Sequence, residues 1–445
     1  MADWHIPWEM MRRFHRAELS REELKAVTRH LLTECPSCRE LSQAAAAERS
    51  PAAGGGAEGV EPYARAFGRL LGGVDEKRWQ VARDRLRGAG QWAMLQPHPS
   101  AVRLRMVRED PGLHTWGLFE RLLEVSRGLV WEDHRAALEA AELALAVGGK
   151  LDPGSFGSER VADFRVAGLG AVANCRRLVA DYAGAQEAFR GAWEAIKEGT
   201  GDPLERARLL ALESALRRDL GELDKAARQL DHAMRLYEQV GDTQQMGRVL
   251  IRMGDILGER DPAKGIELSR QALALLDGAR APRIELCARH NLIWFLAESG
   301  EAREALTLLE EARPLYREFP EPWIQLRLLW LEGLIARTLG ALGEAESIFE
   351  RLWQEFRARG SQHSLTLLSI DLAAIYVERD KLGAGLELLA EVYGLLAGWG
   401  MHSEGLGIWM LMQKALVKRT AKATVFREAT RYFRQAWHAP LHFKE

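Results

Sequence analysis

Residues 339–356 read LGALGEAESIFERLWQEF, and this stretch decides the fold. After a glycine-containing turn, Ala345, Phe349, Leu352 and Phe356 follow at offsets of 0, 4, 7 and 11 residues. These offsets place the four side chains on one face of an α-helix. Glycine in the turn suits the left-handed end of a preceding helix. The stretch therefore predicts two helices joined by a tight turn, with a buried face on the second.

The same pattern recurs along the chain with a period of about 40 residues. Its small first residue recurs at spacings of 41, 39, 40, 40 and 40, at Ala185, Ala226, Gly265, Ala305, Ala345 and Gly385. A second column of small residues precedes it, at Ala173, Ser214, Gly254, Gly333 and Ala373, and Ile293 interrupts this column. Small residues allow two helices to approach closely. A fixed period of this length indicates stacked helical repeats whose columns form the core.

These units resemble tetratricopeptide repeats (TPRs), which have a small residue in the first helix and an Ala, aromatic, Ala pattern in the second. The match covers about 165–397, with an imperfect earlier unit at 113–147. The period is longer than the usual 34 residues. In this respect the units are similar to the lengthened repeats of bacterial signalling ATPases and maltose-regulator-type activators. The resemblance implies an all-α fold, a TPR-like α-α superhelix (solenoid) preceded by a small helical module.

The composition agrees with a soluble helical protein. The 445 residues are 47% hydrophobic and 28% charged, with a net charge of −2, and Leu, Ala, Glu and Arg dominate over Val, Ile and Thr. This profile argues against a large sheet and against disorder throughout. A pI near 6.7 gives no general attraction to nucleic acid. No apolar run approaches a membrane span and the start does not resemble a secretory signal, so we expect a cytoplasmic protein.

Linker composition and the repeat period predict five segments. They are a zinc-binding helical module at 1–42, a flexible Ala/Gly linker at 43–62, a helical N-terminal cap at 63–112, TPR-like repeats at 113–413 and a basic C-terminal capping helix at 414–445. Tyr432, Phe433 and Trp437 are expected on the inner side of the capping helix.

The first segment carries the chemistry that the repeats do not require. Cys35 and Cys38 form a Cys-x-x-Cys turn, which offers two thiolates to one Zn²⁺ ion, and His30 is a third candidate ligand. His5 or His15 is a candidate for the fourth ligand. Upstream, the sequence SREE at 20–23 predicts a capping box that starts a helix reaching about residue 32.

This segment resembles the zinc-binding anti-sigma domain, in which His-x3-Cys-x2-Cys follows an upstream His or Cys. Here the spacing is His-x4-Cys, and five residues of unbroken helix turn the chain by about 500°. Metal binding by His30 and Cys35 therefore requires a break near 33–34, with Pro36 opening the next helix. Two alternatives remain: buried structural cysteines, or a redox-active dithiol without metal. Cys175 and Cys287 are expected to be buried in repeat helices.

The first helices of TPR units line a concave surface on which peptides or partner helices bind. The repeat register assigns to this groove Asn174, Arg177, Arg208, Arg218, Asp255, His290, Trp294, Arg327, Trp330 and Arg337. Several arginines in neighbouring repeats suit an acidic peptide. The alternative is that these arginines are solvated or pair with glutamates of the chain itself.

We find no catalytic signature in the sequence, and the leading hypothesis is a non-enzymatic protein-binding regulator or scaffold. The anti-sigma resemblance implies that the N-terminal module contacts a sigma factor or another regulatory protein. Nucleic acid and membrane are not expected partners. Two alternatives are a sensor of a small molecule or signalling peptide, and an accessory subunit of a multi-protein enzyme.

Overall fold

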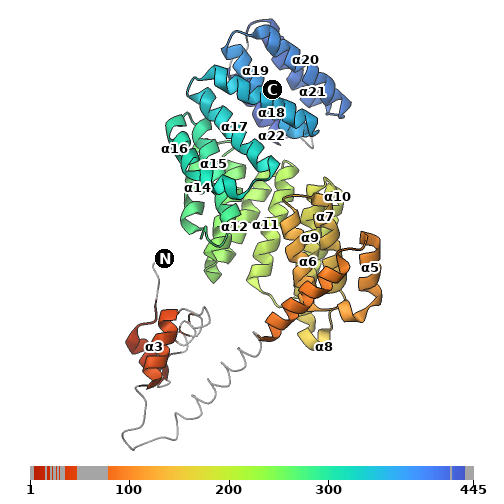
Figure 1. Cartoon of the computed structure of the whole chain (residues 1–445), viewed down its shortest axis with the longest axis vertical. Helices are drawn as coiled ribbons and strands as arrows, with labels where there is room; N and C mark the ends of the chain where they lie inside the picture. Colours follow the sequence, from red (N-terminus) through yellow and green to blue (C-terminus); the bar gives the residue numbers. More distant parts are fainter. Residues whose placement is uncertain are drawn as a thin grey trace, which may run out of the picture. The chain divides into compact units, whose positions relative to one another are not determined.

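The computed structural model describes residues 5–15, 18–20, 23, 27, 30, 36–47, 79–420 and 423–435. Every regular element in these ranges is a helix (Figure 1), which confirms the predicted all-α class. The chain divides into two compact units, Met1–Gly90 and Gln91–Glu445. None of the helices described is both long and apolar enough to cross a membrane.

The first unit contains α1 (Trp8–His15) and α3 (Pro36–Ala47), which pack against each other. Their shared core contains Ile6, Met11, Phe14, Val27, Cys38 and Ala45. The helix that the sequence predicted after Cys35 does begin at Pro36. Because α3 continues to Ala47, the first five positions of the expected linker at 43–62 are helical, and residues 48–62 lie outside the described residues.

The predicted capping box at residue 20 is present. The backbone N–H of Ser20 donates to Glu23 Oε2 at 2.8 Å, and the backbone N–H of Glu23 donates to Ser20 Oγ at 3.3 Å. These hydrogen bonds and that from Arg13 lower the pKa of Glu23 to about 2. The remainder of the expected helix falls mostly outside the described residues.

The second unit begins its repeats after a helix over 79–95, α5 (Ser100–Glu109) and the 3₁₀ turn η1 (Pro111–Leu113). Trp92, Leu95, Val107 and Leu113 of this segment join one buried cluster with side chains of the first repeat. The part of the expected N-terminal cap at 91–112 therefore packs as helical material on the repeats, and residues 63–78 are not described.

Seven helix pairs follow. We call the first member of each pair the A helix: α6 (Trp116–Leu129), α9 (Ser158–Leu178), α11 (Pro203–Asp219), α13 (Thr243–Leu257), α15 (Pro282–Glu298), α17 (Pro322–Thr338) and α19 (Gln362–Glu378). The second members, the B helices, are α7 (His134–Gly148), α10 (Tyr182–Ala195), α12 (Leu223–Val240), α14 (Pro262–Leu275), α16 (Ala302–Glu318), α18 (Leu342–Ala358) and α20 (Leu382–Gly398). The connections include α8 (Pro153–Phe156) and η2 (Ile196–Glu198), and the chain continues with α21 (Ser403–Val417) and α22 (Ala423–Gln435).

The periodic residues form the core, as the sequence predicted. All six small residues of the first column are buried, and so are the residues four and seven positions later. Eleven positions later, only Ile196 and Leu276 are partly exposed. At Gly333, an added Cβ would lie 2.0 Å from Cε1 of Phe349. This contact shows why the A helix needs a small residue where the B helix crosses it.

The turns within the pairs also follow the period. Gly221, Gly300 and Gly340 end three A helices with φ of 76°, 89° and 82°. Ala180 and Asp380 occupy the equivalent positions with φ of 62° and 57°. Non-glycine residues pay a steric penalty in this left-handed region. The turn geometry is therefore set by the repeat rather than by glycine alone.

The A helices from α9 to α17 pack against their neighbours and form one layer. This layer curves back on itself: the ring of Trp131, after α6, stacks on that of Trp323 in α17 with centroids 6.0 Å apart and planes 7° apart. The Arg283 guanidinium lies 5.6 Å from the Trp131 ring centroid and pairs with Glu321. We call the concave side of this layer the inner face.

The C-terminal segment contains two helices where the sequence predicted one. Helix α21 ends at Val417, and α22 packs against both α19 and α21. Tyr432 and Phe433 are buried as expected, and the Phe433 ring lies edge-on to Trp409 with centroids 5.6 Å apart. Trp437 lies outside the described residues.

Candidate functional site

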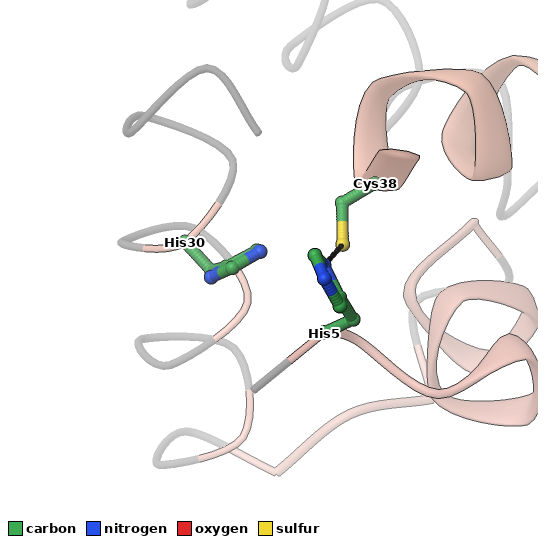
Figure 2. A group of neighbouring side chains, drawn as sticks. All are labelled: His5, His30 and Cys38. Carbon is green, nitrogen blue, oxygen red and sulfur yellow. Dashed lines mark hydrogen bonds between the residues drawn. The ribbon is translucent and has the colours of Figure 1, made fainter. Parts of the chain in front are cut away.

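Three of the four predicted metal ligands converge in the first unit. Candidate ligand atoms of His5, His30 and Cys38 all lie within 4.8 Å of one another, with the three side chains facing a common point (Figure 2). Cys38 Sγ is 3.6 Å from His5 Nδ1, and Cys38 is buried while His5 is exposed. The backbone N–H of Ile6 donates to the same sulfur at 3.3 Å. Cys35 lies outside the described residues.

The distance between Cys38 and His5 suits two ligands of one zinc ion. Zn–S and Zn–N bonds of about 2.3 and 2.0 Å at tetrahedral angles place sulfur and nitrogen about 3.5 Å apart, and Cys38 Sγ lies 3.6 Å from His5 Nδ1. Helix α3 begins at Pro36, where the sequence placed the start of the next helix, and residues 31–35 lie outside the described residues. The donor set of two imidazoles and a thiol is one that Zn²⁺ accepts.

In the second unit, the predicted groove residues of α9, α11 and α13 form a connected network. Arg177 Nη1 lies 2.6 Å from Asp219 Oδ2, and its Nη2 donates to Asn174 Oδ1 at 3.1 Å. Arg218 Nη2 lies 3.0 Å from Asp219 Oδ1, while its Nη1 is 3.8 Å from Asp255 Oδ2. Asp219 therefore holds two arginines from neighbouring repeats, and both cations are already paired.

Helix α22 reaches Trp294, one of the two predicted tryptophans, which packs on the other. Trp294 and Trp330 meet with ring centroids 5.6 Å apart, and the Arg434 guanidinium lies 5.2 Å from the centroid of Trp294. Arg434 Nη2 is 3.0 Å from Glu298 Oε1, although 136 residues separate the two. Trp330 Nε1 donates to Asp371 Oδ2 at 3.2 Å. The chain itself thus covers this part of the inner face.

Two further predicted residues of this region also have partners within the chain. Arg337 Nη2 lies 2.5 Å from Glu378 Oε1, and its Nη1 is 3.9 Å from Asp371 Oδ1. His290 is 8% exposed, and its Nδ1 lies 2.9 Å from the Tyr316 hydroxyl. Burial lowers the pKa of His290 well below its usual value. With Trp330 at 7% exposure, the structure places His290 and Trp330 in the core rather than on open surface.

A set of arginines on the inner face has no carboxylate partner among the residues described. Arg127 on α6, Arg248 on α13 and Arg252 on α13 belong to it, and the sequence interpretation missed all three. The sequence could have identified Arg248, because it follows the predicted Arg208 by one period of 40 residues. Arg208 itself pairs with Glu205 at 2.9 Å, and the exposed Arg327 lies over Trp323 at 5.8 Å.

The pKa shifts of Arg127 and Arg252 indicate that other guanidinium groups lie near them. Burial and the neighbouring Arg177 and Arg218 lower the pKa of Arg252 to about 10, and its Nη1 donates to the carbonyl oxygen of Ala211 on α11. Burial and the neighbouring Arg208 lower the pKa of Arg127 on α6. Positive charge is therefore concentrated where α6, α11 and α13 meet the inner face.

The two remaining cysteines are not arranged for chemistry. Cys175 is 1% exposed and its thiol lies 3.5 Å from Ser126 Oγ. Cys287 is partly buried. Burial raises the pKa of both thiols, which disfavours the reactive thiolate.

Comparison with known proteins supports the fold. A Rap protein solved in complex with Competence and Sporulation Factor superposes with a TM-score of 0.53 at 16% identity, covering 71% of this chain and 87% of that one. Aspartyl phosphate phosphatase F from Bacillus subtilis (TM-score 0.49, 13% identity, 88% of this chain and 95% of that one) and BtubC from P. vanneervenii (0.39, 19%, 55% and 92%) also align. No protein-family model and no curated protein matches the sequence. The chain is a TPR-like α-solenoid repeat protein.

Proposed function

We propose that this chain is a non-enzymatic regulator or scaffold of the cytoplasm that binds a partner protein through the inner face of its solenoid. The observation that carries the proposal is the curved A-helix layer, which presents charged side chains from successive repeats on one concave surface. TPR-like solenoids use this surface for extended peptides and partner helices. The Rap protein that shares the fold was solved with a bound factor.

Site-specific photo-crosslinking tests where the partner binds. A benzophenone amino acid replaces Arg327, which is exposed on α17, and in a matched control replaces Arg303, which is exposed on the B helix α16. We expect a covalent protein adduct, identified by mass spectrometry, from position 327 and not from position 303. Adducts from position 303 alone, or from neither, would contradict the proposal.

We further propose that the N-terminal module is a structural zinc site that uses His5, His30, Cys35 and Cys38. The convergence of three candidate ligands supports it, and the resemblance to the anti-sigma domain extends it to contact with a sigma factor or another regulatory protein. A segment of about 40 residues rarely buries enough apolar surface to fold alone. Bound zinc contributes of the order of 10 kcal/mol of apparent folding free energy in small domains.

Metal analysis of the purified full-length protein tests the zinc site. We expect about one equivalent of zinc, because four N and S ligands complete a structural site. Cys38→Ser removes a ligand and should abolish zinc retention, while Cys175→Ser, in the solenoid, should leave it unchanged. Less than about a tenth of an equivalent, with no dependence on Cys38, would favour the inert or dithiol alternatives.

A second candidate function is a sensor of a signalling peptide. The complex between the structurally similar Rap protein and Competence and Sporulation Factor favours it. The two candidates differ in the size of the ligand at the inner face. Crosslinking from position 327 yields a folded protein under the first proposal and a short peptide under the second.

A further inference from the structure

The inner face carries a group of four arginines, three of which have no carboxylate partner among the residues that the structure describes. The four arginines come from α6, α11 and α13 and are Arg127, Arg208, Arg248 and Arg252. We call the part of the inner face that these helices form the basic half. In the part of the chain that the structure describes, only Arg208 of these four has a carboxylate partner, Glu205. Arg127, Arg208 and Arg248 are solvent-exposed, so an incoming group can reach them.

Contacts between the neighbouring helices α11 and α13 bring part of this set together. The side chain of Arg252 reaches from α13 to the Ala211 carbonyl on α11. Arg218 on α11 reaches in the opposite direction towards Asp255 on α13. Arg127 on α6 lies near enough to Arg208 and Arg248 for their charges to lower its pKa. Arg208 and Arg248 stand one repeat period apart on packed A helices that Arg252 bridges, and Arg127 is their neighbour from α6.

We propose that the basic half is the docking surface for an acidic segment of the partner protein, in which several spaced Asp or Glu carboxylates pair with Arg127, Arg208, Arg248 and Arg252. The proposal rests on the proposed function and identifies the chemistry of the partner. Arginine is suited to this role because its planar guanidinium binds a carboxylate through two parallel hydrogen bonds.

The surrounding charges favour a protein segment over nucleic acid. Glu205, Asp219 and Asp255 lie among the arginines of the same A helices. A nucleic-acid backbone carries a charge at every phosphate and would meet these carboxylates. A protein segment carries carboxylates only at some positions and leaves room between them. Complementary charge also directs the encounter and suppresses wrong partners.

The size of the surface sets the length of the segment. Packed helices lie about 8–10 Å apart, so α6, α9, α11 and α13 together span about 30 Å. An extended chain covers that distance with about ten residues. A short linear segment of the partner is therefore sufficient, and a whole acidic domain is not required.

Fluorescence anisotropy with full-length protein tests the proposal. The probe is a labelled peptide of about 12 residues with alternating Glu and Ser, and the comparison probes are its Lys/Ser counterpart and an oligothymidylate of the same length. The double variant Arg127→Gln/Arg248→Gln removes two exposed, carboxylate-free cations of the basic half. The matched double variant Arg190→Gln/Arg228→Gln removes two exposed arginines of the B helices α10 and α12.

We expect the glutamate peptide to bind saturably and to bind more weakly as the salt concentration rises. Its affinity should fall about tenfold in the inner-face double variant and less than about twofold in the control variant. Absence of binding, equal losses in both double variants, or tighter binding of the oligothymidylate would overturn the proposal. A melting curve for each variant checks that folding is preserved. Loss of the crosslink at position 327 would instead count against the proposed function itself, so the two failures are distinguishable.

Discussion

The inner face of the solenoid has two halves that differ in how their charges are satisfied. In the half formed by α15, α17 and α19, which we call the covered half, α22 brings Arg434 to Glu298 and over Trp294. In the basic half, the surface around Arg248 and Arg252 has no such neutralising segment among the described residues. The fold completes one half with its own C-terminal helix and leaves the other for a ligand.

This difference has a thermodynamic meaning. A partly buried cation with a well-placed carboxylate supports the fold, whereas one surrounded by like charges lowers stability. Proteins keep such unfavourable arrangements where binding needs them, since binding sites are often less stable than the sequence would allow. The covered half is therefore expected to behave as structure and the basic half as a site, which mutations can separate.

The largest effect is expected where α22 is anchored. Phe433 is fully buried against Trp409, so Phe433→Ala should lower the free energy of unfolding by about 3–4 kcal/mol. Chemical denaturation followed by tryptophan fluorescence measures the change. The control is Arg431→Ala on the same helix, where the side chain is exposed. Identical denaturation midpoints for the two variants would show that α22 is not part of the folded core.

Arg434→Gln should lower the free energy of unfolding by about 2 kcal/mol, because Glu298 and Asp371 lose a nearby cation in a partly buried setting. Hydrogen exchange monitored by mass spectrometry should show faster exchange in α22 and in the facing turns of α15 and α19. Arg427→Gln, an exposed position of the same helix, serves as the control. Unchanged exchange in α22 would mean that the ion pair does not hold this helix.

The two halves should also respond oppositely to pH. Burial raises the pKa of Asp371 to about 6, so the stability linked to this group is complete below about pH 4 and is lost as the pH rises through 6. Although burial disfavours its charge, Arg218 and Arg177 lower the pKa of Asp219, so its contribution is lost as the pH falls below about 4.

Thermal melts between pH 3 and 7 measure this contrast. Asp371→Asn should remove a decline of about 1–2 kcal/mol between pH 4 and 6, and Asp219→Asn should remove a rise at lower pH. The same pH profile for both variants would contradict the assignment.

The smallest effect is expected at Arg252. Arg252→Met removes a partly buried cation that faces Arg177 and Arg218, so stability should change by less than about 1 kcal/mol or increase. Arg177→Met, in the same layer, breaks the 2.6 Å pair with Asp219 and should lose about 2 kcal/mol. Urea denaturation compares the two variants. An equal loss in both would show that the basic half is built for stability.

The sequence predicted the repeat core because helical packing is local and periodic. Ala345 and Phe349 are buried because their spacing alone places them on the packed face. The same register did not distinguish inner surface from core at Trp330, since its burial depends on contacts with Trp294, Phe356 and Asp371 from other helices. The repeat period cannot predict a contact between residues that are 136 positions apart, such as that of Arg434 with Glu298.

The candidate sites were predictable to a similar extent. His5 and Cys38 could be paired from donor chemistry because a long loop adds little to the cost of closure. The free cations could not be found from residue type, since Arg177 and Arg248 look alike in sequence. Only the structure shows that Asp219 reaches one of them and that no described carboxylate reaches the other.

Hydrogen exchange of the full-length protein with and without the glutamate peptide tests the central claim most directly. We expect new protection in α6, α11 and α13, around Arg127, Arg208 and Arg248, with α15, α19 and α22 unchanged. Protection confined to α15 and α19 together with release of α22 would contradict the proposal, because the covered half would then be the binding surface.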